Sequence, residues 1–370
     1  MAAETTREKI QLLIPDMPDA DALRPWLLRI DAARWYTNFG PLVQTLESQL
    51  ASRFAAGTQV VTVNSATMGL ELALIALDLP PGARVLLPGL TFAASAAAVL
   101  RAGCVPVFAD VDPDSWLLTP AIAERVAGEM RLGAVMPVST YGAPQSSADW
   151  DAFVARTTLP VVMDAAAAFD TQQMGSRFTA VFSMHATKVI GAGEGGFVAA
   201  ADVAFLERTR MLSNFGIDVS TGSVETAGAN GKLSEYHAAV ALAALDDWPR
   251  RREARVRLHQ AYLQALQRAC PDVRPQRRPA DRAYSIFPVL LPEGHSAPNV
   301  QRRLAAEGIE SRRWYCPTLD RHPAFSAMAR AGTLEQCQVL TARLLALPFH
   351  PFLGAADVER VGNTLARLVA

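Results

Sequence analysis

The chain is predicted to fold as an α/β protein, with a mostly parallel sheet between helices and a smaller α+β domain at its C-terminal end. Three observations favour this fold. Short β-branched runs alternate with longer Ala/Leu-rich segments from about residue 58. Most of these runs are apolar throughout, as strands covered on both faces require. With 370 residues, half of them hydrophobic, the chain is long enough for two domains.

The large domain is expected to begin with strands and helices in alternation. Strands are expected at residues 59–63, 84–87, 105–111, 134–138 and 159–163. The helices between them are expected at residues 68–77, 93–101, 119–130 and 148–156. Pro120 fits this arrangement, because proline is tolerated in the first turn of a helix. Such βαβ units predict that the strands pair in parallel.

The alternation ends after about residue 200. Helices are expected at residues 203–212 and 233–266, and Pro249 predicts a kink or break in the second. A new unit begins near Pro271, with a strand at 286–291 and helices at 300–307, 334–347 and 356–369. We therefore expect an N-terminal arm with short helices at residues 1–35, a large domain at 36–250 and a small α+β domain at 251–370.

The charge pattern argues against a nucleic-acid-binding protein, because the formal net charge is -1. The most basic stretch, the arginines of residues 250–257, is interpreted as the solvated face of a helix. The four cysteines are far apart and fit neither a zinc site nor a disulfide framework, so no metal is expected.

The N-terminal sequence MAAETTREKI lacks the apolar core of a secretory signal. No apolar run reaches the roughly 18 residues that a membrane span needs. We therefore expect a cytoplasmic protein without a membrane partner.

Small residues with hydroxyls follow the first expected strand. Ligands of open α/β sheets bind at the carboxyl ends of the strands, and Ser65, Ala66 and Thr67 stand between such an end and the next helix. Free N–H groups and the helix dipole at a helix start attract a phosphate. The alternative is an ordinary Ser/Thr N-cap.

Two further candidates also follow strands. Asp164 comes directly after the strand at 159–163, where a carboxylate is costly unless it has a cationic partner such as a pyridinium nitrogen. Its alternative role is to cap a helix formed by the four alanines that follow. Phe92 could stack on a planar ring, and core packing is its alternative.

Lys188 lies between two apolar strand-like segments, next to a glycine-dense turn at residues 191–196. Glycines let a backbone pass close to a ligand or another segment. A buried lysine has a depressed pKa and becomes an amine nucleophile, whereas the alternative is a surface lysine in a hairpin. Together the signals supply a phosphate cradle, a ring-stacking face, a ring-nitrogen partner and an amine. These are the parts of a pyridoxal 5'-phosphate (PLP) site.

Longer stretches carry a resemblance to one enzyme family. The most specific are FSMHATKVIGAGEGGFV, which contains Lys188, and VVMDAAAA, which contains Asp164. The others are WYTNFGPLVQTLESQLASRF, VNSATMGLELAL, LPGLTFAASAAAVLRAGCVPVFADVDPDSW, STYGAP, SNFG, ANGKLSEYHAAVALAAL, GIESRRWYCP and LPFHP. With these stretches, which cover most of the chain, the sequence resembles the DegT/DnrJ/EryC1/StrS sugar aminotransferases, PLP enzymes of fold type I.

The resemblance implies a role for each matching position. Lys188 would hold the cofactor as a Schiff base and move protons, and Asp164 would pair with the pyridinium nitrogen so that the ring works as an electron sink. Phe92 would lie over the ring. The phosphate would be held by Ser65, Ala66, Thr67 and Ser183, and by Asn230 of a neighbouring subunit. The resemblance therefore implies a homodimer with shared active sites.

Some positions depart from the family pattern. The family usually has glycine at the position of Ala66, and Gln or His at the position of Ala167. The side chain of His185 could take the place of that missing Gln or His. The family's Asn-Tyr-Arg is Asn230-Gly231-Lys232 here, and Leu319 stands where a histidine is common. These changes lie on the substrate side, for which His185 and Tyr315 are candidates. Because Lys188 is present, the dehydratase branch of the family, which has histidine there, is not expected.

Three functions follow as hypotheses. The first is transfer of an amino group from glutamate or glutamine to a keto-sugar nucleotide, for amino-sugar biosynthesis, with Lys188 as nucleophile and general acid–base. The second is the same chemistry on a non-sugar ketone, such as a cyclitol or a natural-product intermediate. The third is a family member that regulates without catalysis, against which the intact pair of Lys188 and Asp164 argues.

Overall fold

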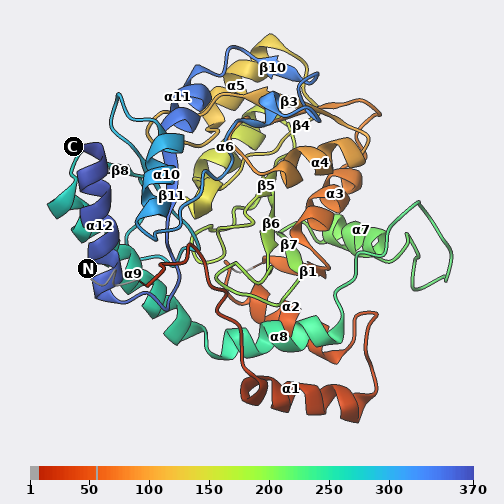
Figure 1. Cartoon of the computed structure of the whole chain (residues 1–370). Coiled ribbons are helices and arrows are strands. Elements are labelled where there is room, and N and C mark those ends of the chain that lie inside the picture. The colour runs from red at the N-terminus through yellow and green to blue at the C-terminus, as the bar shows by residue number, and fades with distance from the viewer. Residues whose placement is uncertain (1–7, 56) are drawn as a thin grey trace.

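The computed structural model describes residues 8–55 and 57–370, and its centre is a large twisted sheet (Figure 1). The sheet has two halves, with strand orders β1-β7-β6-β5 and β10-β3-β2-β4. Parallel bridges from Val135 to Val161 and from Val138 to Asp164 join the halves. The strands are β1 (Gln59–Val63), β2 (Arg84–Pro88), β3 (Val105–Ala109), β4 (Ala134–Val135), β5 (Val162–Asp164), β6 (Thr179–Ser183), β7 (Gly196–Ala200) and β10 (Ala329–Ala331).

The pairings in this sheet are parallel except those of β7, which is antiparallel to both β1 and β6. The expected mostly parallel sheet is therefore confirmed. A loop without a helix between β6 and β7 accounts for the exception, because a short connection can join only antiparallel neighbours. Lys188 lies in that loop.

Helices cover both faces of the sheet. Successive residues of one strand belong to opposite cores: Val60 packs into the cluster that includes α2, α5, α6 and α8, and Val61 into the cluster that includes α3, α4 and α7. Leu86 and Leu87 divide in the same way. The helices are α2 (Pro41–Ala51), α3 (Ala66–Ala76), α4 (Ala93–Arg101), α5 (Pro120–Glu129), α6 (Ser147–Thr157), α7 (Val203–Ser213) and α8 (Glu235–Asp246).

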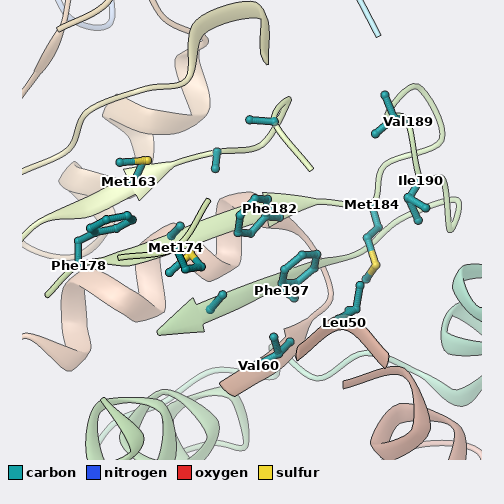
Figure 2. Close-up of a cluster of buried hydrophobic side chains, with 14 of the residues drawn as sticks. Leu50, Val60, Met163, Met174, Phe178, Phe182, Met184, Val189, Ile190 and Phe197 are labelled. Atoms are coloured by element: carbon teal, nitrogen blue, oxygen red, sulfur yellow. The ribbon is translucent and has the colours of Figure 1, made fainter. Parts of the chain in front are cut away.

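One of these cores packs beside the loop between β6 and β7, residues 184–195, which contains Lys188 and is called the lysine loop below. Figure 2 shows Phe182 of β6 beside Phe197 of β7, with Val189 and Ile190 from the loop that follows Lys188. The rings of Phe182 and Phe197 stack with centroids 4.7 Å apart. Stacked and fully buried aromatic rings hold the two strands in register, so the loop between them starts from a rigid base.

The C-terminal part of the chain has a second, smaller sheet, β11-β9-β8, with antiparallel pairing. Its strands are β8 (Arg274–Pro275), β9 (Phe287–Leu290) and β11 (Leu344–Leu347), and its helices are α9 (Trp248–Ala269), α10 (Ala297–Ala306), α11 (Glu335–Arg343) and α12 (Ala355–Val369). A separate core cluster joins Tyr262, Phe287 and Val361. Part of the segment nevertheless pairs with the large sheet, because β10 lies parallel to β3.

Three expected elements differ from the structure. The expected helix at 233–266 is two helices, α8 and α9, and Pro249 lies in the first turn of α9. The expected helix at 334–347 ends at Arg343, because the apolar run that follows pairs with β9 as β11. The arm expected at 1–35 contains one helix of 14 residues, α1 (Ala20–Ala33), and residues 1–7 lie outside the described residues.

The interpretation of residues 250–257 as a solvated helix face is wrong for two arginines. Arg251 and Arg255 are 3% and 2% exposed. Arg251 forms an ion pair with the buried Asp16 of the N-terminal segment, at 3.1 Å. Arg255 donates to the carbonyl of Tyr284. This side of α9 therefore joins the N-terminal segment to the small domain. Among the described residues, no helix is long and apolar enough to cross a membrane.

Candidate active site

A cavity of about 550 Å³ opens at the carboxyl ends of the parallel strands of the large sheet. The far side is closed by Leu12 and Leu13 of the N-terminal segment and by residues of the C-terminal part: Ser285, Ile286, Arg312, Trp314, Tyr315, Ala346, Leu347 and Phe349. The predicted residues that line it are Ser65, Ala66, Thr67, Phe92, Asp164, Ser183, His185, Lys188 and Tyr315. The topology therefore brings together side chains that are up to 250 positions apart in sequence.

Backbone hydrogen bonds fix the lysine loop. The amide of Met184 donates to the carbonyl of Gly195, and the amide of Ala186 to the carbonyl of Gly193, both at 2.9 Å. The amide of Lys188 donates to the carbonyl of His185 at 2.8 Å. This compact turn directs Lys188 into the cavity instead of outward, so the alternative of a surface lysine in a hairpin does not describe it.

The glycines after Lys188 allow a close approach of two segments. A Cβ atom at Gly196 would lie 2.7 Å from both the amide nitrogen of Ala66 and the carbonyl oxygen of Phe182. Only a residue without a side chain lets β7 pass this near to the start of α3. The glycine motif therefore joins the lysine loop to the predicted phosphate cradle.

Lys188 and Asp164 influence each other across the cavity. Burial lowers the pKa of Lys188, and the charge of Asp164 opposes that shift. Burial raises the pKa of Asp164, whereas the hydrogen bond from Ser95, the amide of Ala166 and the charge of Lys188 lower it. A lysine whose pKa is lowered releases its proton more easily, which favours a nucleophilic amine.

Asp164 is 5% exposed, and both of its carboxylate oxygens accept hydrogen bonds. Oδ2 accepts from the hydroxyl of Ser95 at 2.7 Å, and Oδ1 from the amide of Ala166 at 3.1 Å. The alanines that follow form turns and not a helix, so the alternative helix-capping role does not apply. A buried carboxylate that faces a cavity fits a cationic ring nitrogen.

The start of α3 combines both interpretations offered for it. Ser65 is its N-cap, and its hydroxyl accepts a hydrogen bond from the amide of Met68 at 3.2 Å. The amides of Ala66 and Thr67 belong to the first turn, where backbone N–H groups have no partner within the helix. These amides, the dipole of α3 and the nearby hydroxyl of Ser183 suit a phosphate group.

Phe92 does not pack in the core, because 55% of its surface is exposed and it lines the cavity. Its ring centroid is 6.1 Å from that of Tyr315. Tyr315 in turn stacks on Tyr141 at 5.0 Å, and the hydroxyl of Tyr141 donates to the carbonyl of Trp314 at 2.8 Å. Three aromatic rings in series thus form one wall, and a planar ring fits against Phe92.

His185 lines the cavity, and its side chain is 44% exposed. Its Nδ1 accepts the amide proton of Thr187 at 3.2 Å, and the hydroxyl of Thr187 lies 2.8 Å away. The ring proton is therefore on Nε2, which lies 3.7 Å from Oε1 of Glu194. His185 was expected to replace the Gln or His that the family has at the position of Ala167. Its ring is instead held by Thr187 of its own loop.

Asn230 does not line this cavity. It is exposed, in the segment between α7 and α8, and its side-chain oxygen accepts a hydrogen bond from Lys232 at 2.9 Å. Ala167 lines the cavity, and its carbonyl packs against Gly142, where a Cβ atom would approach to 2.6 Å. Leu319 is buried in a core and is not a cavity residue.

Several residues of the site were not predicted from the sequence. Ser95 is the third residue of α4, and its hydroxyl lies 2.9 Å from that of Thr91, which precedes the helix. Tyr141 has a positive φ of 57°, which is unusual for a tyrosine and which the sequence does not signal. Leu12 and Leu13 precede the first helix and carry no motif.

The assembled parts fit PLP. The N-terminus of α3 could hold a phosphate, Phe92 could stack on a ring, Asp164 could pair with a ring nitrogen and Lys188 offers an amine, all in one cavity. The glycine packing at Gly196 shows that the cradle and the lysine loop are built against each other.

Comparisons with known proteins agree with this geometry. The chain is 34% identical over 351 residues to the erythromycin biosynthesis sensory transduction protein EryC1 of Saccharopolyspora erythraea, covering 91% of this chain and 92% of that protein. It is 33% identical over 346 residues to the dTDP-3-amino-3,4,6-trideoxy-alpha-D-glucose transaminase of Streptomyces venezuelae, covering 90% and 88%.

Solved structures give the same picture. A putative PLP-dependent aminotransferase from Bacillus cereus matches with a TM-score of 0.91 at 28% identity, covering 97% of this chain and all of that chain. DesI, solved with its TDP-sugar product, matches with a TM-score of 0.87 at 31% identity, covering 98% and 93%. The protein is a PLP-dependent aminotransferase with the fold expected of it. The model of the DegT/DnrJ/EryC1/StrS aminotransferase family matches residues 22–366, and the chain belongs to that family.

Proposed function

We propose that this aminotransferase moves an amino group from glutamate or glutamine to a keto-sugar nucleotide, in the biosynthesis of an amino sugar. One observation carries the chemical part of the proposal: Lys188 and the buried Asp164 face each other in a single cavity at the carboxyl ends of the strands. The sugar part rests on relatives whose names include a sugar transaminase and whose structures include one with a TDP-sugar product.

Lys188 is the proposed nucleophile and proton carrier. The chain has three lysines, and the other two, Lys9 and Lys232, are occupied elsewhere: Lys9 pairs with Glu310 at 2.6 Å, and Lys232 donates to Asn230. PLP, when bound, supplies an aldehyde that condenses with amines and a ring that withdraws electrons. Freed by the incoming donor amine, Lys188 Nζ takes the proton from the α-carbon of the donor.

Asp164, Phe92 and the start of α3 are proposed to hold the cofactor. The carboxylate of Asp164 keeps the ring nitrogen protonated, which strengthens the ring as an electron sink. Phe92 would lie over the ring, and the amides of Ala66 and Thr67, with the hydroxyls of Ser65, Thr67 and Ser183, would hold the phosphate. His185 and Tyr315 line the cavity and would lie on the substrate side, with Tyr315 as part of the aromatic wall.

Arg312 is the proposed partner of the donor carboxylate. Of the arginines in the described residues, it alone lines the cavity, and it makes no ion pair within the described part of the chain. Its guanidinium lies over the ring of Trp314, 4.4 Å from the centroid, which holds it in place while its N–H groups stay free. Arg312→Gln is expected to raise KM for glutamate with a smaller change in kcat.

A second subunit is proposed to complete the phosphate site. Asn230 is exposed outside its own cavity and sits beside the exposed apolar residues Phe215, Val219 and Val224. Exposed apolar side chains in one segment favour a protein contact. Mixing Lys188→Ala protomers with Asn230→Ala protomers tests this arrangement. Restored activity in the mixture supports shared sites, and unchanged inactivity contradicts them.

The donor and acceptor are tested separately. PLP-loaded enzyme is treated with glutamate or with glutamine, and conversion to the pyridoxamine form is followed by absorbance. Failure with both amino acids would refute the proposed donor. A panel of nucleotide-linked keto-sugars is then offered to the pyridoxamine form. Return of the original spectrum with one of them supports the proposed acceptor.

A second acceptor class has one observation in its favour. The side of the cavity that faces the large sheet has an apolar wall, formed by Leu12, Leu13, Ile286, Leu347 and Phe349. Such a wall favours a substrate with few hydroxyl groups on that side. Turnover of a cyclic non-sugar ketone, without turnover of any nucleotide-linked keto-sugar, would support this alternative.

A further inference from the structure

Asp164 ends a chain of buried hydroxyl groups. The hydroxyl of Thr91 lies 2.9 Å from that of Ser95, and the hydroxyl of Ser95 lies 2.7 Å from Asp164 Oδ2. Thr91 is 1% exposed and Ser95 is fully buried. Thr91 lies in the loop between β2 and α4, Ser95 in the first turn of α4 and Asp164 at the end of β5.

The direction of the hydrogen bonds follows from the carboxylate. An ionised carboxylate only accepts hydrogen bonds, so Ser95 must donate its proton to Asp164. Its oxygen is then free to accept the proton of Thr91. The Oγ–Oδ2 distance of 2.7 Å between Ser95 and Asp164 is that of a well-formed hydrogen bond from a hydroxyl. A protonated Asp164 would instead compete with Thr91 as a donor.

Two features of α4 support the ionised form. Ser95 is the third residue of the helix, so its hydroxyl and the positive end of the helix dipole both act on Asp164. The hydrogen bond from Ser95 lowers the pKa of Asp164, against the larger effect of burial. The N-cap of the same helix is Phe92, so one helix start bears both the ring-stacking residue and the residue that holds the carboxylate.

We propose that Ser95, oriented by Thr91, is a positioning residue that keeps Asp164 ionised and directed at the ring nitrogen of the cofactor. The proposal rests on the role of Asp164 in the proposed function. It assigns a purpose to two buried hydroxyls, those of Thr91 and Ser95. Removal of the Ser95 hydroxyl then weakens one particular contact of the cofactor and leaves its phosphate and its link to Lys188 unchanged.

The test compares PLP with 1-deaza-PLP, in which carbon replaces the ring nitrogen. The dissociation constants of both are measured by titration of the apoenzyme, and the preference is their ratio. Wild type is expected to prefer PLP, and Ser95→Ala to reduce that preference by roughly tenfold, because hydrogen bonds to charged groups are strong. Thr91→Val is expected to reduce it by roughly threefold, whereas Thr91→Ser, which keeps the hydroxyl, should retain it.

Two further variants separate the possible failures. Asp164→Asn should abolish the preference, and Thr209→Val, which removes a buried hydroxyl in α7 that donates to the carbonyl of Phe205, should retain it. If Asp164→Asn loses the preference and Ser95→Ala keeps it, the inference is wrong and the role of Asp164 stands. If Asp164→Asn also keeps it, both are wrong.

A merely structural role gives a different result. Ser95→Ala would then weaken PLP and 1-deaza-PLP by the same factor and leave their ratio as in wild type. Such an outcome overturns the inference. The melting temperature of each apoenzyme variant shows which loss of affinity comes from unfolding, and the ratio is taken on folded protein.

Discussion

His259 should make the stability of this protein fall as the pH is lowered below about 6.5. The side chain is 1% exposed and lies in α9, with its ring centroid 4.7 Å from that of Tyr284 and 5.5 Å from that of Phe287. Within the described residues, its Nδ1 has no hydrogen-bond partner. Burial, with a contribution from the charge of Arg278, lowers the pKa of His259 from 6.5 to about 3.

The sign of the effect follows from these two pKa values. In the unfolded chain His259 binds a proton near pH 6.5, but in the folded protein it stays neutral until about pH 3. Protonation therefore favours unfolding. The contribution of His259 to stability is complete above pH 6.5 and is lost as the pH falls toward 3. Between pH 7.5 and pH 5 the loss is about 2 kcal/mol, from the linkage relation.

The assay is urea unfolding of the apoenzyme at pH 7.5 and pH 5, for wild type and His259→Gln. The loss of stability between the two pH values should be about 2 kcal/mol smaller in the variant. Other groups, including the buried His350, contribute equally to both proteins and cancel. His295→Gln, on an accessible loop before α10, serves as the control and should behave as wild type. Equal losses in wild type and His259→Gln would refute the reasoning.

Two substitutions should weaken the framework of the site. Gly196→Ala inserts a methyl group against the amide of Ala66 and should cost about 1–3 kcal/mol of stability and also weaken PLP binding, measured by urea unfolding and by titration; unchanged PLP affinity would contradict the close packing of β7 on α3. The buried carboxylate of Glu235 accepts hydrogen bonds from the amides of Leu42 and Val43, at 2.8 and 2.9 Å. Glu235→Gln removes its charge and should lower the free energy of unfolding by about 1–3 kcal/mol in the same assay. Wild-type stability would show that the charge does not hold the start of α2.

Each of these substitutions has a matched control. Gly128→Ala adds a methyl group in α5, where no atom lies within 4 Å of the new Cβ, so stability should rise or stay unchanged. Glu225→Gln removes an exposed carboxylate between α7 and α8, and a change below about 0.5 kcal/mol is expected.

The large domain could be predicted well because its strands are buried on both faces. The run at 59–63 matches β1 residue for residue, and the sheet is parallel where βαβ units connect the strands. The same regularity locates the cavity, since carboxyl ends of parallel strands meet at one edge. This edge is where the sequence places Lys188, Asp164 and Phe92, each after a strand or strand-like segment.

The rest depends on contacts that leave no local pattern. The run at 344–347 reads equally well as the end of a helix, and its pairing with β9 decides that it is a strand. β10 has three residues, two of them exposed, too few for a periodicity. The burial of Arg251 depends on Asp16, which lies 235 positions away in sequence. The role inferred for Ser95 depends on its hydrogen bond to Asp164, which lies 69 positions away in sequence.

The most direct test of the account is the position of the covalently bound cofactor. Purified enzyme is loaded with PLP, reduced with borohydride, digested and mapped by mass spectrometry. Because the chain has only three lysines, Lys9, Lys188 and Lys232, the peptides are easily distinguished. The account predicts the phosphopyridoxyl group on the peptide that contains Lys188, and its loss in Lys188→Ala. Modification of Lys9 or Lys232 in its place, or of no lysine, would contradict it.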